Sequence, residues 1–191
     1  MSSKVKGTCT ELFAPVRELF ESHFAEGQSC GASVSVCIGD ELVVDLYGGD
    51  KDTDPKLGEW EADTLVNVYS VTKGWTALCV HMLKERGHID SYDDPIAKYW
   101  PEFAAKGKEG VTIRMALAHK TGLQTLRHPV YDIEQATNWG YMTGLLAAQA
   151  PWWEPGSKSA YHAFTFGHIN GEIVRRCDPK HRSIGKLFDT D

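Results

Sequence analysis

Ser70 and Lys73 form the feature that most constrains this chain, because they stand three residues apart where a long helical pattern begins. Residues with this spacing share one face of a helix, so the hydroxyl and the amine can meet. A serine hydroxyl attacks well only when a neighbouring base takes its proton, and a lysine is such a base when desolvation or a nearby cation lowers its pKa. Free N–H groups at a helix N-terminus favour negative charge beside the serine. The pattern predicts a serine hydrolase that works through an acyl-enzyme.

The Ser-x-x-Lys spacing is a weak signal alone, because it occurs three times in the chain. Ser3 and Lys6 lie in a polar N-terminal tail, where chains are usually loose. Ser183 and Lys186 lie near the C-terminus, where the serine resembles a helix cap. Only Ser70 begins a long apolar pattern, with Trp75, Leu78, Met82 and Leu83. From spacing alone, a plain helix cap is an equal alternative for Ser70.

Composition argues against several classes of function. The 191 residues suffice for one domain with a core, and the net charge of −6 offers no basic patch to a nucleic acid. No apolar run is long enough to span a membrane, and residues 1–10 lack the apolar core of a secretory signal. Five scattered cysteines, an odd number, suit free thiols in a reducing compartment. We therefore expect a cytoplasmic protein with no membrane span and no nucleic-acid partner.

The N-terminal part of the chain predicts a helix followed by an antiparallel hairpin, within residues 10–48. Apolar residues at helical spacing predict the helix over residues 10–25. Residues 34–38 and 42–46 alternate between apolar and polar, and Gly39-Asp40 between them is a turn signal. The polar residues 50–62 predict a surface loop.

The remainder predicts helices and no linker, so we expect a single domain over residues 1–191. The helix that carries Ser70 and Lys73 is predicted over residues 70–87, with Gly87 as its C-cap. A helical region follows over residues 94–177. Its predicted parts are a short helix capped by Asp94 with Pro95 in the first turn, a segment capped by Thr112, one helix over residues 132–150, and a last full helix ending near Cys177.

Four stretches occur in an order that favours one family. They are Val68–Lys73, then Gly87–Asp90 with Asp93–Pro101, then Val111–Leu123, and finally Trp153–Lys158 leading to Tyr161–Gly167. Together they resemble the serine beta-lactamase-related family, which includes class C beta-lactamases, DD-peptidases and family VIII carboxylesterases. The resemblance runs from about Gly31 to the end of the chain, and the joint signal is far more specific than the tetrapeptide.

This resemblance implies an α/β fold of the beta-lactamase and transpeptidase type, in which helices flank an antiparallel sheet and a helical region is inserted. It implies that Tyr161 faces Ser70 and Lys73 as the catalytic tyrosine. A phenol whose pKa is lowered by a nearby ammonium can pass a proton between the serine and the leaving group. Without the family, a packing or turn tyrosine is the plainer interpretation. Trp153 and His162 are the candidate substrate-binding residues, although an aromatic turn that packs on the core also explains Trp153.

Ala163 is the first departure from the family pattern. Beta-lactamases carry an asparagine at this position, two residues after the tyrosine, and it contacts the substrate amide. Alanine has no side chain that can form such a hydrogen bond. The Tyr-His-Ala form resembles the esterase branch, so we expect a small ester, or an amide, as the substrate in preference to a beta-lactam.

Length is the second departure. Family members continue after the tyrosine with further strands, one of which bears a Lys-Thr-Gly-like motif whose backbone N–H completes the oxyanion hole. Lys120-Thr121-Gly122 spells that motif but precedes the tyrosine, at the His-x-x-Gly-Leu turn. We therefore expect a C-terminally truncated domain with half of an oxyanion hole, the loss of one such donor costing about 3 kcal/mol of barrier stabilisation. The alternative function is an inactive interaction module, and a homo-oligomer is one way to cover unpaired sheet edges.

Eight histidines invite a metal interpretation, which the spacing does not favour. There is no His-Glu-x-x-His pattern and no cysteine–histidine cluster with ligand spacing. His162 and His168 are six residues apart, which does not bring them to one helical face. His119 lies at a helix end, where a cation or a cap explains it. We predict no metal and no other cofactor.

Overall fold

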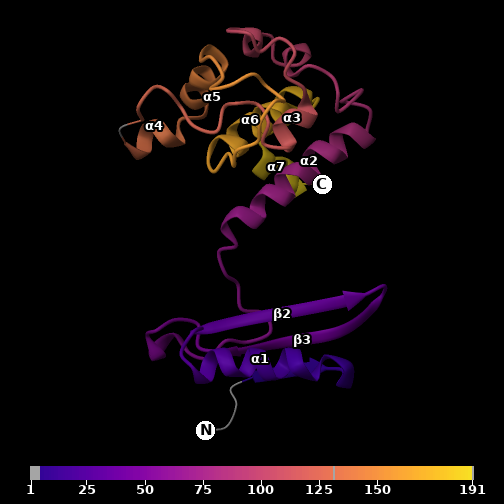
Figure 1. Ribbon diagram of the computed structural model, residues 1–191, viewed down its shortest axis with the longest axis vertical. Coiled ribbons are helices and arrows are strands. Elements are labelled where there is room, and N and C mark those ends of the chain that lie inside the picture. Colours follow the sequence, from indigo (N-terminus) through magenta and orange to yellow (C-terminus); the bar gives the residue numbers. More distant parts are fainter. Residues whose placement is uncertain (1–4, 131, 191) are drawn as a thin grey trace. The chain divides into compact units, whose positions relative to one another are not determined.

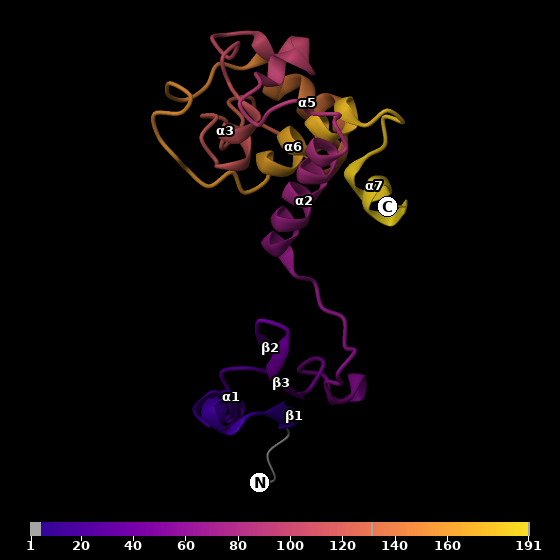
Figure 2. The ribbon, with the colours of Figure 1, turned by 90° about the vertical axis from the view of Figure 1, so that its right-hand side faces the viewer.

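The computed structural model describes residues 5–130 and 132–190, except for the side chain of residue 55. The chain divides into two compact units, residues 1–67 and residues 68–191, which Figures 1 and 2 show in two views. Among the described residues, no helix combines the length and the apolar character needed to cross a bilayer. The five cysteines are free thiols.

The first unit is a three-stranded antiparallel sheet with one long helix. The order of its strands is β1 (Val5–Cys9), β3 (Glu41–Gly49) and β2 (Gly31–Ile38). The predicted hairpin is confirmed, and Gly39 turns it with a φ of +59°. Strand alternation buries Val44 and Leu46, and helix α1 (Ala14–Ala25) places Val16 and Phe20 against them. Two short 3₁₀ helices, Glu11–Phe13 and Pro55–Leu57, complete the unit.

Strand β1 is a correction to the expected loose tail. It pairs with the central strand β3 from Val5 opposite Gly48 to Cys9 opposite Val44. Gly7 has a φ of +97°, and a Cβ at this position would lie 2.0 Å from the carbonyl oxygen of Asp45. Only glycine allows the two backbones to approach this closely.

The second unit is helical. Its helices are the 3₁₀ helix Tyr69–Val71, α2 (Thr72–Glu85), the 3₁₀ helices Ile96–Lys98 and Pro101–Ala104, α3 (Ile113–Leu117), α4 (Ile133–Thr137), α5 (Trp139–Ala148), α6 (Thr165–Cys177) and α7 (Ile184–Thr190). Helices α2 and α6 lie side by side in both views, and the core forms where they meet (Figures 1 and 2). Val80 and Leu83 of α2 and Ile173 of α6 are fully buried there. The core therefore ties the helix after Ser70 to the helix after Tyr161.

Local capping signals explain where the helix predictions succeeded. Thr112 Oγ1 accepts a hydrogen bond from Met115 N at 3.2 Å, so this predicted cap is confirmed. The C-cap of α2 is Arg86, one residue before the predicted Gly87, and Gly87 follows it in a left-handed conformation with a φ of +76°. The Asn170-Gly171 pair, which also suits a hairpin turn, lies inside helix α6.

Two helix predictions were wrong. Residues 132–150 form two helices, because Asn138 starts a new one by accepting a hydrogen bond from Tyr141 N at 3.0 Å. Asp94 does not cap the short 3₁₀ helix Ile96–Lys98, whose N-cap is Pro95. Its carboxylate instead accepts hydrogen bonds from Tyr99 and Lys98.

Lys108 is the largest charged side chain inside the helical unit, with no exposed surface. Its Nζ donates to three carbonyl oxygens, those of Ala105, Ala147 and Gln149, the Ala147 bond being 2.9 Å long. The last two carbonyls belong to the C-terminal end of α5, whose final C=O groups have no partner within the helix. Burial lowers the pKa of Lys108 to about 8.

Replacing Lys108 by methionine should strongly destabilise the helical unit. Lys108→Met keeps the length of the side chain but leaves three carbonyl groups without their donor, which we expect to cost about 3 kcal/mol of unfolding free energy. Denaturant unfolding followed by circular dichroism measures this cost. Lys106→Met is the matched control, since Lys106 is exposed. Equal midpoints for the two variants would contradict the proposed role of Lys108.

The same lysine predicts a pH dependence of stability. Its pKa is about 8 in the folded chain against an ordinary value of 10.5, so the unfolded chain binds more protons between these pH values. The contribution of this group to stability therefore rises as the pH increases from about 8 to 10.5, and it is lost as the pH falls through 8. We expect wild type to gain stability relative to Lys108→Met across this window, as measured by urea unfolding at each pH. A constant difference between the two would contradict the expectation.

Candidate active site

Ser70 lies in the short 3₁₀ helix that leads into α2, and its side chain is exposed. Tyr69, directly before it, has a φ of +46°, a left-handed conformation that costs a non-glycine residue about 1–2 kcal/mol. The N-caps of the 3₁₀ helix and of α2 are Val68 and Val71, and neither helix start is capped by a side chain. The helix-cap alternative for Ser70 is therefore wrong.

Lys73 connects the serine to a distant segment. Its Nζ donates to Ser70 Oγ at 3.0 Å and to the carbonyl oxygen of Ala163 at 2.8 Å. The same ammonium lies 4.8 Å from the ring centre of Tyr161 and 6.0 Å from that of Phe166. A cation at these distances is attracted to the face of an aromatic ring. Lys73 thus draws the start of α2 and the segment before α6 together.

Tyr161 completes the group. It lies in the segment between α5 and α6, and its side chain is 56% exposed. Hydrogen bonding to Ser70, hydrogen bonding to Lys73 and the charge of Lys73 together hold the pKa of Tyr161 below its ordinary value. The structure therefore brings together the three residues that the sequence predicted as catalytic.

The other two Ser-x-x-Lys copies differ from this one. Ser183 Oγ accepts a hydrogen bond from Lys186 N at 3.3 Å, so Ser183 is the helix cap that the sequence indicated. The side chain of Lys186 pairs with Asp189. Ser3 lies outside the described residues.

His162, a predicted substrate-binding residue, faces the interior and is only 1% exposed. Its Nδ1 lies 2.6 Å from the carbonyl oxygen of Ala160, and its Nε2 lies 2.7 Å from Thr121 Oγ1. Burial, the largest effect, lowers the pKa of His162. The ring therefore supports the tyrosine segment from within, and a contact with substrate stays a prediction.

Trp153, the other predicted substrate-binding residue, is half-buried in the turn before this segment. Two backbone hydrogen bonds hold the turn, from Trp152 N to Gly122 O at 2.8 Å and from Gly156 N to Lys120 O at 2.9 Å. Lys120-Thr121-Gly122 is therefore a support for the turn. The indole Nε1 of Trp153 is buried and has no partner among the described residues.

Sequence reasoning missed two participants. The carbonyl of Ala163 accepts from Lys73, a contact that no side-chain pattern predicts. His119 lies just past the end of α3, as the sequence indicated, but its ring lies against Tyr161 and Phe166, with ring-centre distances of 5.0 and 4.8 Å, which neither a cation nor a cap at a helix end predicts. The His-x-x-Gly-Leu turn was the one available signal for His119.

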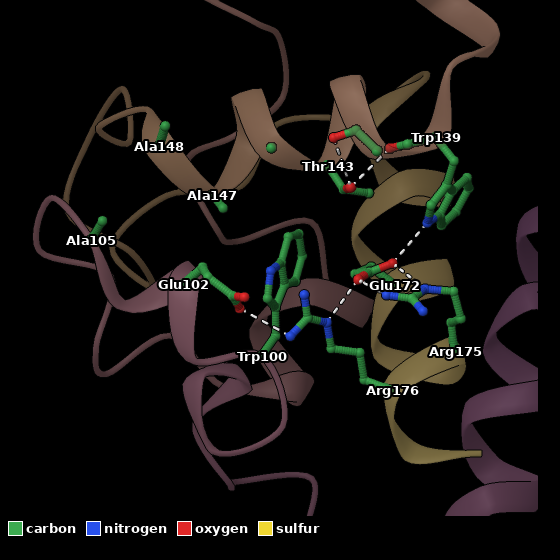
Figure 3. Close-up of a pocket in the computed structure, with 12 residues that line it drawn as sticks. Trp100, Glu102, Ala105, Trp139, Thr143, Ala147, Ala148, Glu172, Arg175 and Arg176 are labelled. Carbon is green, nitrogen blue, oxygen red and sulfur yellow. Dashed lines mark hydrogen bonds and ion pairs between the residues drawn. The ribbon is translucent and has the colours of Figure 1, made fainter. Parts of the chain in front are cut away.

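The helical unit also has a cavity of about 670 Å³ between α5, α6 and the segment after Trp100 (Figure 3). Glu172 is buried at its edge. Burial alone would raise the pKa of Glu172, but hydrogen bonds from Arg175, Arg176 and Trp139 hold it at about 2. Neither Ser70, Lys73 nor Tyr161 lines this cavity. Among the described residues, no group of three or more metal-ligating side chains is arranged to hold an ion.

Comparisons with known proteins agree with this geometry. The family model described as beta-lactamase matches residues 16–191. The esterase/beta-lactamase LipL of Mycobacterium tuberculosis is 37% identical over 98% of this chain, which covers 44% of LipL. A crystal structure of a family VIII carboxylesterase matches with a TM-score of 0.86 and 41% identity, covering 97% of this chain and 50% of that one. A penicillin-binding protein homologue from Caulobacter crescentus matches with a TM-score of 0.88 and 38% identity, covering 98% of this chain and 49% of that one.

The chain thus spans about half the length of these relatives. Its antiparallel sheet and its helices follow the beta-lactamase and transpeptidase-like fold, as the sequence predicted. The match to the family model extends over most of the chain and includes the segments of Ser70, Lys73 and Tyr161. The chain therefore belongs to the beta-lactamase family.

Proposed function

We propose that this chain carries the catalytic centre of a serine esterase that acts through an acyl-enzyme. The observation that carries the proposal is the 3.0 Å hydrogen bond from Lys73 Nζ to Ser70 Oγ, with the ring centre of Tyr161 4.8 Å from the same Nζ. A serine is activated when a base lies within hydrogen-bond reach of its hydroxyl and a third group orients the two. Family membership, with esterases among the relatives, supports the same class of reaction.

In the proposed reaction, Ser70 Oγ attacks the ester carbonyl carbon, and Lys73 Nζ takes the serine proton while it passes one of its own protons to the oxygen of Tyr161. A bond forms between Oγ and that carbon, and the bond from the carbon to the alkoxy oxygen breaks. Tyr161 passes a proton to the departing oxygen, so an alcohol leaves and the acyl group stays on the serine. Water then attacks the acyl carbon while Tyr161 takes one of its protons. The bond between that carbon and Ser70 Oγ breaks, the acid leaves, and the proton passes from Tyr161 through Lys73 to Ser70 Oγ.

The proposed substrate is an ester of modest size with an apolar group. A mainly apolar cavity of about 410 Å³ is lined by Leu126, Val130, Met142 and Phe164. Phe164, one of its lining residues, directly follows Ala163, whose carbonyl oxygen accepts a hydrogen bond from Lys73 Nζ. Ala163 has no polar side-chain atom to bind the amide group of a beta-lactam. We propose that Trp153 and His162 bind the substrate from outside this cavity, since neither residue lines it.

The alternative is a chain that binds a partner without turnover. It is favoured by the exposed apolar side chains beside Ser70, since Tyr69 is 79%, Val71 65% and Trp75 49% exposed. Large exposed apolar groups in one region are typical of interaction surfaces. Hydrolysis that depends on Ser70 separates the two functions.

Replacing the serine should abolish turnover. We expect Ser70→Ala to reduce kcat for a short-chain nitrophenyl ester on the order of 10³-fold or more, because the change removes the hydroxyl that lies 3.0 Å from Lys73 Nζ and acts as the nucleophile. Ser183→Ala is the matched control, since Ser183 has the same spacing to a lysine. If wild type and Ser70→Ala hydrolysed the ester at the same background rate, this result would contradict the esterase proposal and favour the binding alternative.

Removing the phenol hydroxyl should slow both halves of the reaction. Tyr161→Phe keeps the ring that lies over Lys73 but loses the proton relay, so we expect kcat to fall on the order of 10²-fold or more with a smaller change in KM. Stopped-flow kinetics separate acylation from deacylation. Tyr141→Phe, a half-buried tyrosine outside this group, is the control. Unchanged rates in Tyr161→Phe would exclude Tyr161 as the relay.

A further inference from the structure

We propose that the neutral imidazole ring of His119 holds Tyr161 in position. Protonation of His119 on acidification then releases the tyrosine and switches the site off. This inference rests on the proposed function, because it concerns the regulation of the same site. Sequence reasoning assigned His119 no part in that site. Its backbone, its ring and its charged neighbour each support the proposal.

The backbone conformation of His119 is unusual. Its φ of +59° is left-handed, a conformation that costs a non-glycine residue about 1–2 kcal/mol. Histidine therefore takes this conformation at a local cost, and such strain gathers at functional sites. Neighbouring backbone bonds compensate, including Lys120 N to Met115 O at 2.8 Å.

His119 contacts three successive residues of the tyrosine segment. Its carbonyl oxygen accepts from Ala160 N at 3.2 Å, and its Nδ1 accepts from His162 N at 3.0 Å. Between these two bonds, its ring lies against the ring of Tyr161, with centres 5.0 Å apart and planes tilted by 39°. The residues before and after Tyr161 are thus bonded to His119, and the tyrosine itself is stacked on it.

The bond from His162 N determines the tautomer of His119. A backbone amide can only donate, so the Nδ1 atom that accepts from it carries no proton. The neutral ring therefore holds its proton on Nε2. A proton added to Nδ1 would face the amide N–H of His162 and remove this bond, because two donors cannot pair.

The charges around His119 oppose such protonation at neutral pH. Burial and then the charge of Lys73 lower the pKa of His119 below its ordinary 6.5. The titratable groups that face it are Lys73 from α2 and Tyr161 and His162 from the tyrosine segment. Because the folded state favours the neutral ring, its contribution to the site is complete above pH 6.5 and is lost as the pH falls through the lowered pKa.

Two substitutions separate positioning from simple packing. His119→Asn removes the titration but keeps an acceptor near the place of Nδ1, and asparagine tolerates a left-handed backbone. His119→Ala removes the acceptor and the ring. His181→Asn is the matched control, because His181 is also left-handed, with a φ of +52°, and exposed.

Ester hydrolysis across pH is the first readout. We expect His119→Ala to lose about tenfold or more in kcat with little change in KM, while His119→Asn stays within about threefold of wild type. We also expect the acid limb of the kcat profile to move to lower pH in His119→Asn but not in His181→Asn. An acid limb that is the same in wild type and His119→Asn would overturn the switch.

Nuclear magnetic resonance supplies a readout that needs no turnover. Nitrogen-15 shifts should show His119 protonated on Nε2 only at pH 7, and carbon-13 labelled tyrosine should show the pKa of Tyr161 rising toward 10 in His119→Ala. A proton on Nδ1, or a Tyr161 titration unchanged by His119→Ala, would overturn the positioning role. Absent hydrolysis in wild type would contradict the esterase proposal alone, because these spectra still decide the role of His119.

Discussion

One ammonium group, that of Lys73, organises the site in the helical unit. It is bonded to a hydroxyl near the start of α2 and to a backbone carbonyl just before α6, so it joins the N-terminal ends of two helices that pack together. Its charge also lowers the pKa of Tyr161 and of His119. The largest causes of these two pKa shifts are hydrogen bonding to Ser70 for Tyr161 and burial for His119, and Lys73 contributes to both. Because Ser70 and Tyr161 are exposed, salt and water screen this charge, and its effect on the phenol weakens as the ionic strength rises.

Helix α6 is the common support for this arrangement. Thr165 Oγ1, in its first turn, donates to Leu123 O at 2.7 Å and thereby holds the turn that follows His119. Further along, Gly171 allows the Trp139 ring to approach to 2.5 Å from where a Cβ would stand. The adjacent Glu172 uses both carboxylate oxygens on Arg175, Arg176 and Trp139. Because every partner of this buried charge is supplied by the protein, the cluster keeps α6 in place without a ligand.

The parts of the fold that depend on neighbouring residues were predictable from the sequence. The hairpin turn at Gly39, the cap at Thr112 and the C-terminal end of α2 at Gly87 each follow from local turn or capping chemistry. Strand β1 escaped prediction because its polar, glycine-containing segment becomes a strand only through pairing with β3. The break at Asn138 was missed because a long apolar pattern masked a capping side chain inside it.

The candidate site divides in the same way. Ser70 and Lys73 are near in sequence, so their contact follows from helix geometry, and Tyr161 was found through the order of several motifs. The contributions of His119 and Ala163 could not be predicted, since both depend on which segments meet in three dimensions. The Nδ1 atom of His119 accepts a hydrogen bond from the backbone amide of His162. Only the folded structure shows where that amide lies, so the sequence alone did not distinguish this role from that of a cation at a helix end. The same holds for a carbonyl that accepts from a lysine.

The three contacts between His119 and residues 160–162 have a consequence for building hybrid proteins from this family. The tyrosine segment and the turn that begins at His119 act as one module, although more than thirty residues separate them in the chain. If the tyrosine segment alone were exchanged, the new backbone would have to form its hydrogen bonds with a histidine whose conformation fits the original segment. Exchanges between relatives should therefore move both segments together. The hydrogen bonds between the two segments, and not their distance in the sequence, determine which residues such an exchange must include.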